Sequence, residues 1–65
     1  MRLTHYSKYF RVTLNPKSAV YDSDTFELIA ATKDGLTWKV SAGAEDHFVG
    51  ERVSRYDLER WVEAW

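Results

Sequence analysis

The chain ends in the stretch Val53-Ser-Arg-Tyr-Asp-Leu-Glu-Arg-Trp-Val-Glu-Ala-Trp65, and this stretch decides the fold. Ser54 is a favourable N-cap, and Asp57 stands three residues later, where a capping box places its acidic residue. The apolar residues that follow repeat at i, i+3, i+4 and i+7, which is the spacing of one helical face. They are Leu58, Trp61, Val62 and Trp65. The sequence therefore predicts an amphipathic C-terminal helix, and the preceding residues must supply the surface on which it packs.

A chain of 65 residues has room for one small domain, which we expect to span residues 1–65. A domain of this size buries only about 60% of its unfolded surface, so its stability is marginal. The chain has no cysteine, but it has three Trp, four Tyr and three Phe, and each large aromatic side chain can bury about 150–250 Å². The absence of cysteine and of any long apolar segment fits a cytoplasmic protein.

The first predicted strand covers residues 6–14. Tyr6, Phe10, Val12 and Leu14 alternate with polar residues, which is typical of a half-buried strand. The sequence Asn15-Pro16-Lys17-Ser18 predicts a turn after it, and residues 19–21 form a short extended segment.

Residues 25–33 fit two structures. Asp24-Thr-Phe-Glu27 resembles a capping box, with Gly35 at the C′ position of a helix. Alternatively, these residues form a hairpin with residues 36–41, turning at Lys33-Asp34-Gly35. A three-residue loop with Gly35 in the left-handed conformation pairs Ala30 with Trp38 and Leu28 with Val40. This register gathers the apolar residues on one buried face, and it favours strands. The gathered residues are Phe26, Leu28, Ala30, Leu36, Trp38 and Val40.

Residues 47–53 predict a short last strand, interrupted by Gly50 at a bulge or an edge. The expected fold class is therefore α+β: a small antiparallel β-meander of three to four strands, with one C-terminal helix packed on one face.

Residues suited to catalysis or metal binding are few. The two histidines are His5 and His47, and the adjacent side chains of Glu45, Asp46 and His47 diverge, which is poor geometry for a metal site or a proton relay. Three glycines at separate turns do not make a phosphate-binding loop. We expect a non-enzymatic protein with no cofactor and no metal.

Two surfaces are candidates for binding. The first is acidic and aromatic, and it would suit a basic protein partner, although a solvated helix face gives the same pattern. Its residues are Tyr56, Glu59, Arg60, Glu63, Glu45 and Asp46. The second lies on the first strand, where Tyr9 and Arg11 alternate with polar residues near Arg2, His5 and Lys8. Such a strand contacts single-stranded nucleic acid in some proteins, but a charged edge strand that resists aggregation looks the same.

Charge is distributed unevenly along the chain. Residues 1–21 hold four basic and no acidic residues, whereas all ten acidic residues lie at or after Asp22. The net charge of the chain is −1. The sequence pI is about 6.0, whereas most nucleic-acid-binding domains are strongly basic.

Residues 49–62, Val-Gly-Glu-Arg-Val-Ser-Arg-Tyr-Asp-Leu-Glu-Arg-Trp-Val, resemble the wing and last helix of excisionase-type winged-helix proteins. The resemblance implies a DNA-binding regulator in which Gly50 turns the wing, Arg52 faces the phosphates, and Leu58 and Trp61 seal the core. The residues expected to contact DNA are Arg11, Lys39, Arg52 and Arg55. That family also needs a basic recognition helix, whereas residues 36–41 alternate like a strand.

The expected function is a small protein-binding module that regulates or inhibits a partner protein, with DNA binding as the alternative. In size, aromatic content and lack of cysteine, the chain resembles the compact accessory proteins of phages and mobile elements, including inhibitors of host defence.

Overall fold

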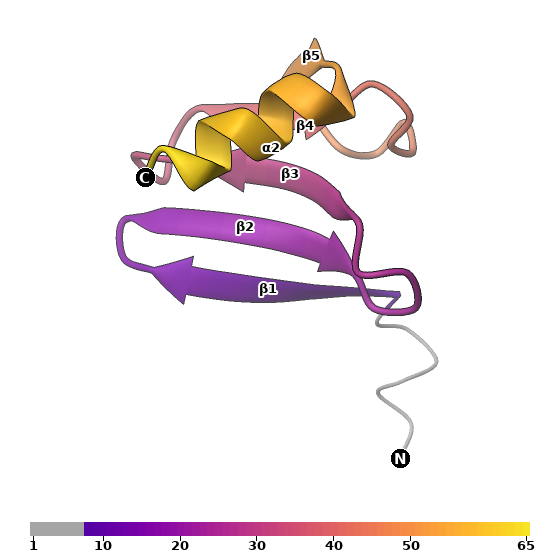
Figure 1. Ribbon diagram of the computed structural model, residues 1–65, viewed down its shortest axis with the longest axis horizontal. Coiled ribbons are helices and arrows are strands. Elements are labelled where there is room, and N and C mark those ends of the chain that lie inside the picture. The colour runs from indigo at the N-terminus through magenta and orange to yellow at the C-terminus, as the bar shows by residue number, and fades with distance from the viewer. Residues whose placement is uncertain (1–7) are drawn as a thin grey trace.

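The computed structural model describes residues 8–65 and has five strands followed by one helix (Figure 1). The elements are β1 (Tyr9–Leu14), β2 (Lys17–Asp22), β3 (Leu28–Thr32), β4 (Trp38–Ser41), β5 (Glu51–Val53) and α2 (Arg55–Glu63). The strands form one sheet in the order β1-β2-β3-β4-β5, and α2 packs mainly on β3 and β4. The predicted α+β class is confirmed, with one strand more than expected.

β1 and β2 form a hairpin whose strands join through Asn15 and Pro16, with Leu14 opposite Lys17. The predicted strand is confirmed over Tyr9–Leu14, while Tyr6 lies outside the described residues. β1 is an outer strand of the sheet. Among the described strands it pairs with β2 alone, as expected of an edge strand.

β3 resolves the ambiguity in residues 25–33 in favour of a strand, but the strand is irregular. Val20 pairs with Ala30, whereas the next β2 residue, Tyr21, pairs with Leu28, so Ile29 is an extra residue in β3. Such a β-bulge reverses the alternation of side chains beyond it. As a result, Leu28 joins Ala31 in the core beneath α2, and the prediction that Leu28 and Ala30 share a face is wrong.

β3 and β4 pair as a hairpin, two residues out of the predicted register. Ala30 pairs with Val40 and Thr32 with Trp38. The connection is longer than expected because the Asp34 carboxylate accepts hydrogen bonds from the backbone N–H groups of Leu36 and Thr37, both at 2.8 Å. Gly35 has φ 80°, so its predicted left-handed conformation is confirmed.

Asp34 gives the β3–β4 loop a pH dependence. The two backbone hydrogen bonds from Thr37 and Leu36 lower the pKa of Asp34 from its ordinary value of 3.8 to about 2. Since the pKa is lower in the folded state, the stabilisation is complete above about pH 4 and is lost as the pH falls towards 2. We expect the urea midpoint of the wild type to exceed that of Asp34→Asn at pH 5, and the difference to shrink by pH 2. An equal difference at both pH values would contradict this role.

β5 departs from a simple meander because it runs parallel to β4, with Val40 opposite Arg52. Parallel neighbours need a crossover connection, and residues 42–50 provide it by passing over the face of the sheet opposite α2. The Arg52 guanidinium holds this crossover by donating to the backbone carbonyls of Ala44 (2.7 Å), Glu45 (3.0 Å) and Phe48 (3.0 Å).

Trp38 and Val40 lie beneath this crossover and not beneath the helix, contrary to the prediction. Together with Val20 and Ala30, they line a hollow that Phe48 and Val49 also border. The Arg11 guanidinium lies 5.3 Å from the centroid of the Trp38 ring, in a cation–π contact. Both faces of the central strands are therefore covered, one by α2 and the other by the crossover.

The C-terminal helix begins and packs as the sequence predicts. The Ser54 side chain accepts a hydrogen bond from the N–H of Asp57 at 3.1 Å. Leu58 is fully buried against Ala19, Leu28 and Ala31. Around this cluster pack the half-buried side chains of Tyr21, Val53, Trp61, Val62 and Trp65. In the described part of the chain, no helix has the length and apolar character that a membrane span requires.

Candidate functional site

The predicted partner-binding residues do not form one surface. Glu45 and Asp46 lie in the crossover, whereas Tyr56, Glu59, Arg60 and Glu63 lie on α2 on the other side of the sheet. Tyr56 is 67% exposed, and the Arg60 guanidinium lies 5.6 Å from its ring centroid. The helix residues therefore remain candidates for one site, from which Glu45 and Asp46 are separated by the sheet.

Glu45 has a role within the fold, because its carboxylate accepts a hydrogen bond from the Tyr9 hydroxyl. This bond raises the pKa of Tyr9 to about 12 and lowers the pKa of Glu45. The Tyr9 ring also meets the Phe48 ring edge-on, with centroids 4.9 Å apart. Tyr9 therefore attaches the crossover to β1.

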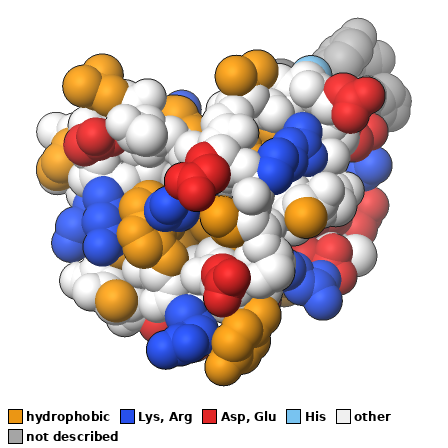
Figure 2. Space-filling model, turned by 90° about the horizontal axis from the view of Figure 1, so that it is seen from above, with side chains coloured by type: hydrophobic (Ala, Val, Ile, Leu, Met, Phe, Trp, Pro, Cys, Tyr) orange, Lys and Arg blue, Asp and Glu red, His pale blue; other side chains and the backbone are white. Residues whose placement is uncertain are grey.

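The four basic residues of the DNA-binding alternative each contact a group within the chain. Arg11 donates to Ser18 Oγ at 2.6 Å, and Lys39 pairs with Glu51 at 2.8 Å. Arg52 holds the crossover, and Arg55 pairs with Glu27. In the view of Figure 2, basic and acidic side chains are interspersed among isolated apolar ones. The residues where the winged-helix resemblance requires a recognition helix form β4.

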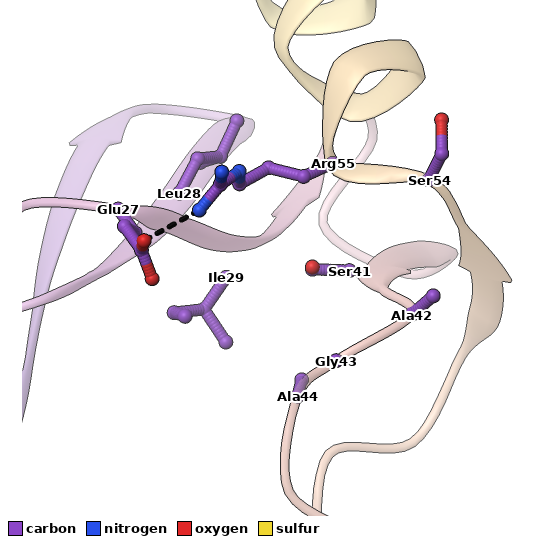
Figure 3. Close-up of a pocket in the computed structure, with 9 residues that line it drawn as sticks. All are labelled: Glu27, Leu28, Ile29, Ser41, Ala42, Gly43, Ala44, Ser54 and Arg55. Carbon is purple, nitrogen blue, oxygen red and sulfur yellow. Dashed lines mark hydrogen bonds and ion pairs between the residues drawn. The ribbon is translucent and has the colours of Figure 1, made fainter.

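The Glu27–Arg55 pair borders a surface pocket of about 390 Å³ between the start of β3 and the start of α2 (Figure 3). Small side chains from Ser41, Ala42 and Ala44 line its other side. The Ser41 hydroxyl points into this space, but the carboxylate of Glu27 already pairs with Arg55, the one cation among the described residues of the lining. These described residues therefore offer no unpaired charge with which to select a ligand.

The most distinctive surface is an apolar trough over β1 and β2, on the same side of the sheet as α2. We define the trough by Phe10, Val12, Leu14, Tyr21 and Phe26. Phe10, Val12 and Leu14 point to this side because they pair with Tyr21, Ala19 and Lys17, and both Ala19 and Tyr21 belong to the core beneath α2. The trough is open because α2 packs mainly on β3 and β4 (Figure 1).

The trough exposes more large apolar side chains than are buried among residues 8–65. Phe10 is 39% exposed, Val12 45%, Leu14 65% and Phe26 70%, whereas three of the six buried hydrophobic residues in this part of the chain are alanines. The rings are ordered against each other: Phe10 stacks on Tyr21 at 5.4 Å and meets Phe26 edge-on at 5.8 Å. A contiguous exposed apolar surface of this kind typically marks an interaction site.

The wall of the trough is the side of α2 that carries Glu59, Val62 and Glu63. These three residues enclose a hollow of about 190 Å³ together with Tyr21, Phe26 and Leu28. Two of the predicted partner-binding acids, Glu59 and Glu63, therefore border the apolar surface.

Phe26 is held in a strained conformation at the end of the trough. Its φ is 62°, a left-handed value that is rare for an aromatic residue. The turn is fixed by a hydrogen bond from the Phe26 N–H to the Asp22 carbonyl at 2.8 Å. The Asp22 carboxylate accepts further bonds from the N–H groups of Asp24 and Thr25. Such strain persists only where the surrounding structure fixes it, and here the turn holds an exposed aromatic ring at the end of the trough.

We expect Phe26→Gly to leave stability unchanged or to raise it, although a phenyl ring is lost. Glycine relieves a left-handed strain of about 1–2 kcal/mol, which offsets about 0.5–1.5 kcal/mol for the ring contact with Phe10. Urea unfolding measures the net change in the free energy of unfolding. Tyr21→Ala is the control: Tyr21 packs on the core, so this variant should be clearly destabilised. A loss above about 1 kcal/mol in Phe26→Gly would show that the ring supports the fold.

The sequence did not reveal the trough because alternation shows which residues share a face, but not what covers that face. Phe10, Val12 and Leu14 were expected to share one face of a half-buried strand, and Phe26 was expected on the buried face of its hairpin; the structure leaves all four exposed. A usable signal was present in the chain: one short helix cannot cover every apolar strand residue.

Among residues 8–65, no three His, Asp or Glu side chains are arranged to hold a metal ion. Comparisons with models of protein families, with curated proteins and with solved structures gave no match.

Proposed function

We propose that the protein is a non-enzymatic binding module that docks on a protein partner through the trough and regulates or inhibits that partner. The observation that carries the proposal is the row of exposed apolar side chains on β1, continued by Phe26. Aromatic residues are enriched at the centres of protein interfaces, and acidic residues belong at the rim. The trough has this arrangement, with Glu59 and Glu63 beside Phe26.

Stability gives a second line of support. A small domain gains little from leaving large apolar side chains in water, and burying one fully is worth about 1.5–3 kcal/mol. A partner that covered Val12, Leu14 and Phe26 would recover part of this free energy on binding. The proposed place of action is the cytoplasm, since the fold relies on aromatic packing and not on disulfides.

Affinity capture with matched variants tests the proposal. The bait is the full chain, and the lysate comes from the organism that makes it, with and without nuclease. We expect a protein to be retained by the wild type in both conditions and lost by Val12→Gln/Leu14→Gln. The matched control is Leu36→Gln/Val49→Gln, which changes two apolar residues that are 85% and 84% exposed and lie outside the trough.

Equal capture by the trough variant and the control variant would overturn the proposal. Loss of capture on nuclease treatment would instead support the DNA-binding alternative, for which affinity should also fall steeply with salt.

A further inference from the structure

We infer that the occupant of the trough is an amphipathic helix of the partner, with basic residues along the edge that faces α2. This inference rests on the proposed function and adds the chemistry of the partner. Three observations support it: the width of the open sheet, the length of β1, and the acids on the wall of the trough.

The open part of the sheet is about one helix wide. Five strands with spacings of about 4.8 Å span roughly 19 Å between the outer strands. A helix with its side chains is about 10–12 Å in diameter. Since α2 packs mainly on β3 and β4, the area over β1 and β2 accommodates one further helix beside it.

The length of the trough sets the length of the occupant. β1 has six residues and is about 20 Å long, and its apolar row from Phe10 to Leu14 covers about 13 Å of this length. At a rise of 1.5 Å per residue, a helix of about 13 residues spans the full length of β1. Such a helix presents three to four apolar positions at i, i+3, i+4 and i+7, enough to cover Phe10, Val12 and Leu14.

The expected charge of the bound helix follows from the acidic residues of α2 that border the trough. Glu59 and Glu63 are exposed, lie one helical turn apart on α2, and border the hollow beside Tyr21 and Phe26. A helix lying parallel to α2 would bring one of its edges against these two carboxylates. Lysine or arginine on that edge would complement them, whereas acidic residues there would be repelled.

A strand added to the edge of β1 fits the surface less well than a helix. Edge pairing uses the free backbone groups of β1, but it leaves the faces of Phe10 and Val12 uncovered and does not reach Glu59 or Glu63. A helix laid over the trough contacts both the apolar row and the acids.

A peptide probe tests the inference on the full chain. The probe has about 14 residues, with leucine at helical spacing on one face and lysine elsewhere; a second probe has glutamate in place of lysine. We expect the basic probe to shift the amide signals of β1, β2, Phe26 and Val62 in NMR spectra and to become helical when bound. We expect Glu59→Lys/Glu63→Lys to weaken binding about tenfold or more, because two attractions become repulsions.

The matched comparison is Glu63→Lys against Asp46→Lys. Both variants change the net charge equally, but Asp46 lies in the crossover on the opposite face, so only Glu63→Lys should weaken binding.

The inference would be overturned if the acidic probe bound as well as the basic probe, or if both variants weakened binding equally. It would also be overturned if the NMR shifts were confined to other faces of the protein. A homodimer that Val12→Gln dissociates would also overturn it, by making a second copy the occupant. A captured partner that needs the trough but offers no basic helix would refute this inference and leave the proposed function intact.

Discussion

Replacing Leu58 by alanine is expected to unfold most of the protein at 25 °C. Leu58 is fully buried at the centre of the cluster that joins α2 to the sheet. Leucine-to-alanine changes at such sites cost about 2–5 kcal/mol. A single core in a chain of this size rarely provides more than about 3–5 kcal/mol. The loss is therefore comparable with the whole stability of the fold.

Far-ultraviolet circular dichroism and urea titration measure this effect. The control is Leu36→Ala, because Leu36 is 85% exposed in the β3–β4 loop and its truncation should change stability by no more than about 0.5 kcal/mol. Similar unfolding midpoints for Leu58→Ala and Leu36→Ala would mean that α2 does not seal the core.

Replacing Gly50 by alanine is the second change with a large expected effect. A Cβ atom at Gly50 would lie 2.6 Å from the backbone carbonyl oxygen of Trp38 and 3.0 Å from Val40 Cγ2. Since the nearest atom belongs to the backbone of β4, the clash can be relieved only by moving β5 away from β4. Forcing atoms into so tight a site typically costs about 1–3 kcal/mol.

Gly43→Ala is the matched control for this experiment. Gly43 lies in the same crossover, but a Cβ atom there meets nothing within 4 Å, and its φ is not positive. Alanine at such a position is expected to stabilise the fold by about 0.4–1 kcal/mol, because it restricts the unfolded chain. Urea midpoints that move in opposite directions would support the close approach of Gly50 to β4, and midpoints that move together would refute it.

The sequence predicted the helix best because its signals are local. The cap at Ser54 and the spacing of Leu58, Trp61 and Val62 depend only on neighbouring residues, and each is confirmed. The first strand and the turn after it were also readable, since alternation and proline mark them directly, but β2 begins at Lys17, inside the predicted turn, and is longer than the extended segment expected over residues 19–21. The hairpin register favoured a strand over a helix for residues 28–32, and the strand is confirmed although the register is two residues out.

The errors arose where distant contacts decide the outcome. The bulge at Ile29 changes which residues of β3 face the helix, and the alternation of apolar and polar residues does not predict this bulge. Asp34 lengthens the β3–β4 loop through hydrogen bonds that a count of loop residues does not reveal. The parallel pairing of β5 requires the crossover, and Arg52, which seemed suited to phosphates, holds that crossover instead.

For the candidate site, the sequence indicated Glu59 and Glu63 but not the apolar surface that they border. Whether Val12 and Leu14 are covered depends on the width of the sheet relative to one helix of nine residues. That comparison needs the number of strands, and the sequence predicted too few. The partner-binding role of these residues stays a prediction.

α2 covers only part of its face of the sheet, because it packs mainly on β3 and β4, so the trough is open in the free protein. Methyl NMR of the dilute chain with a soluble paramagnetic agent measures this directly. We predict strong broadening for the methyl groups of Val12 and Leu14, and little for those of Leu58 and Val40, which are almost fully buried. Equal protection of all four residues would show that the trough is already covered, and it would contradict the account.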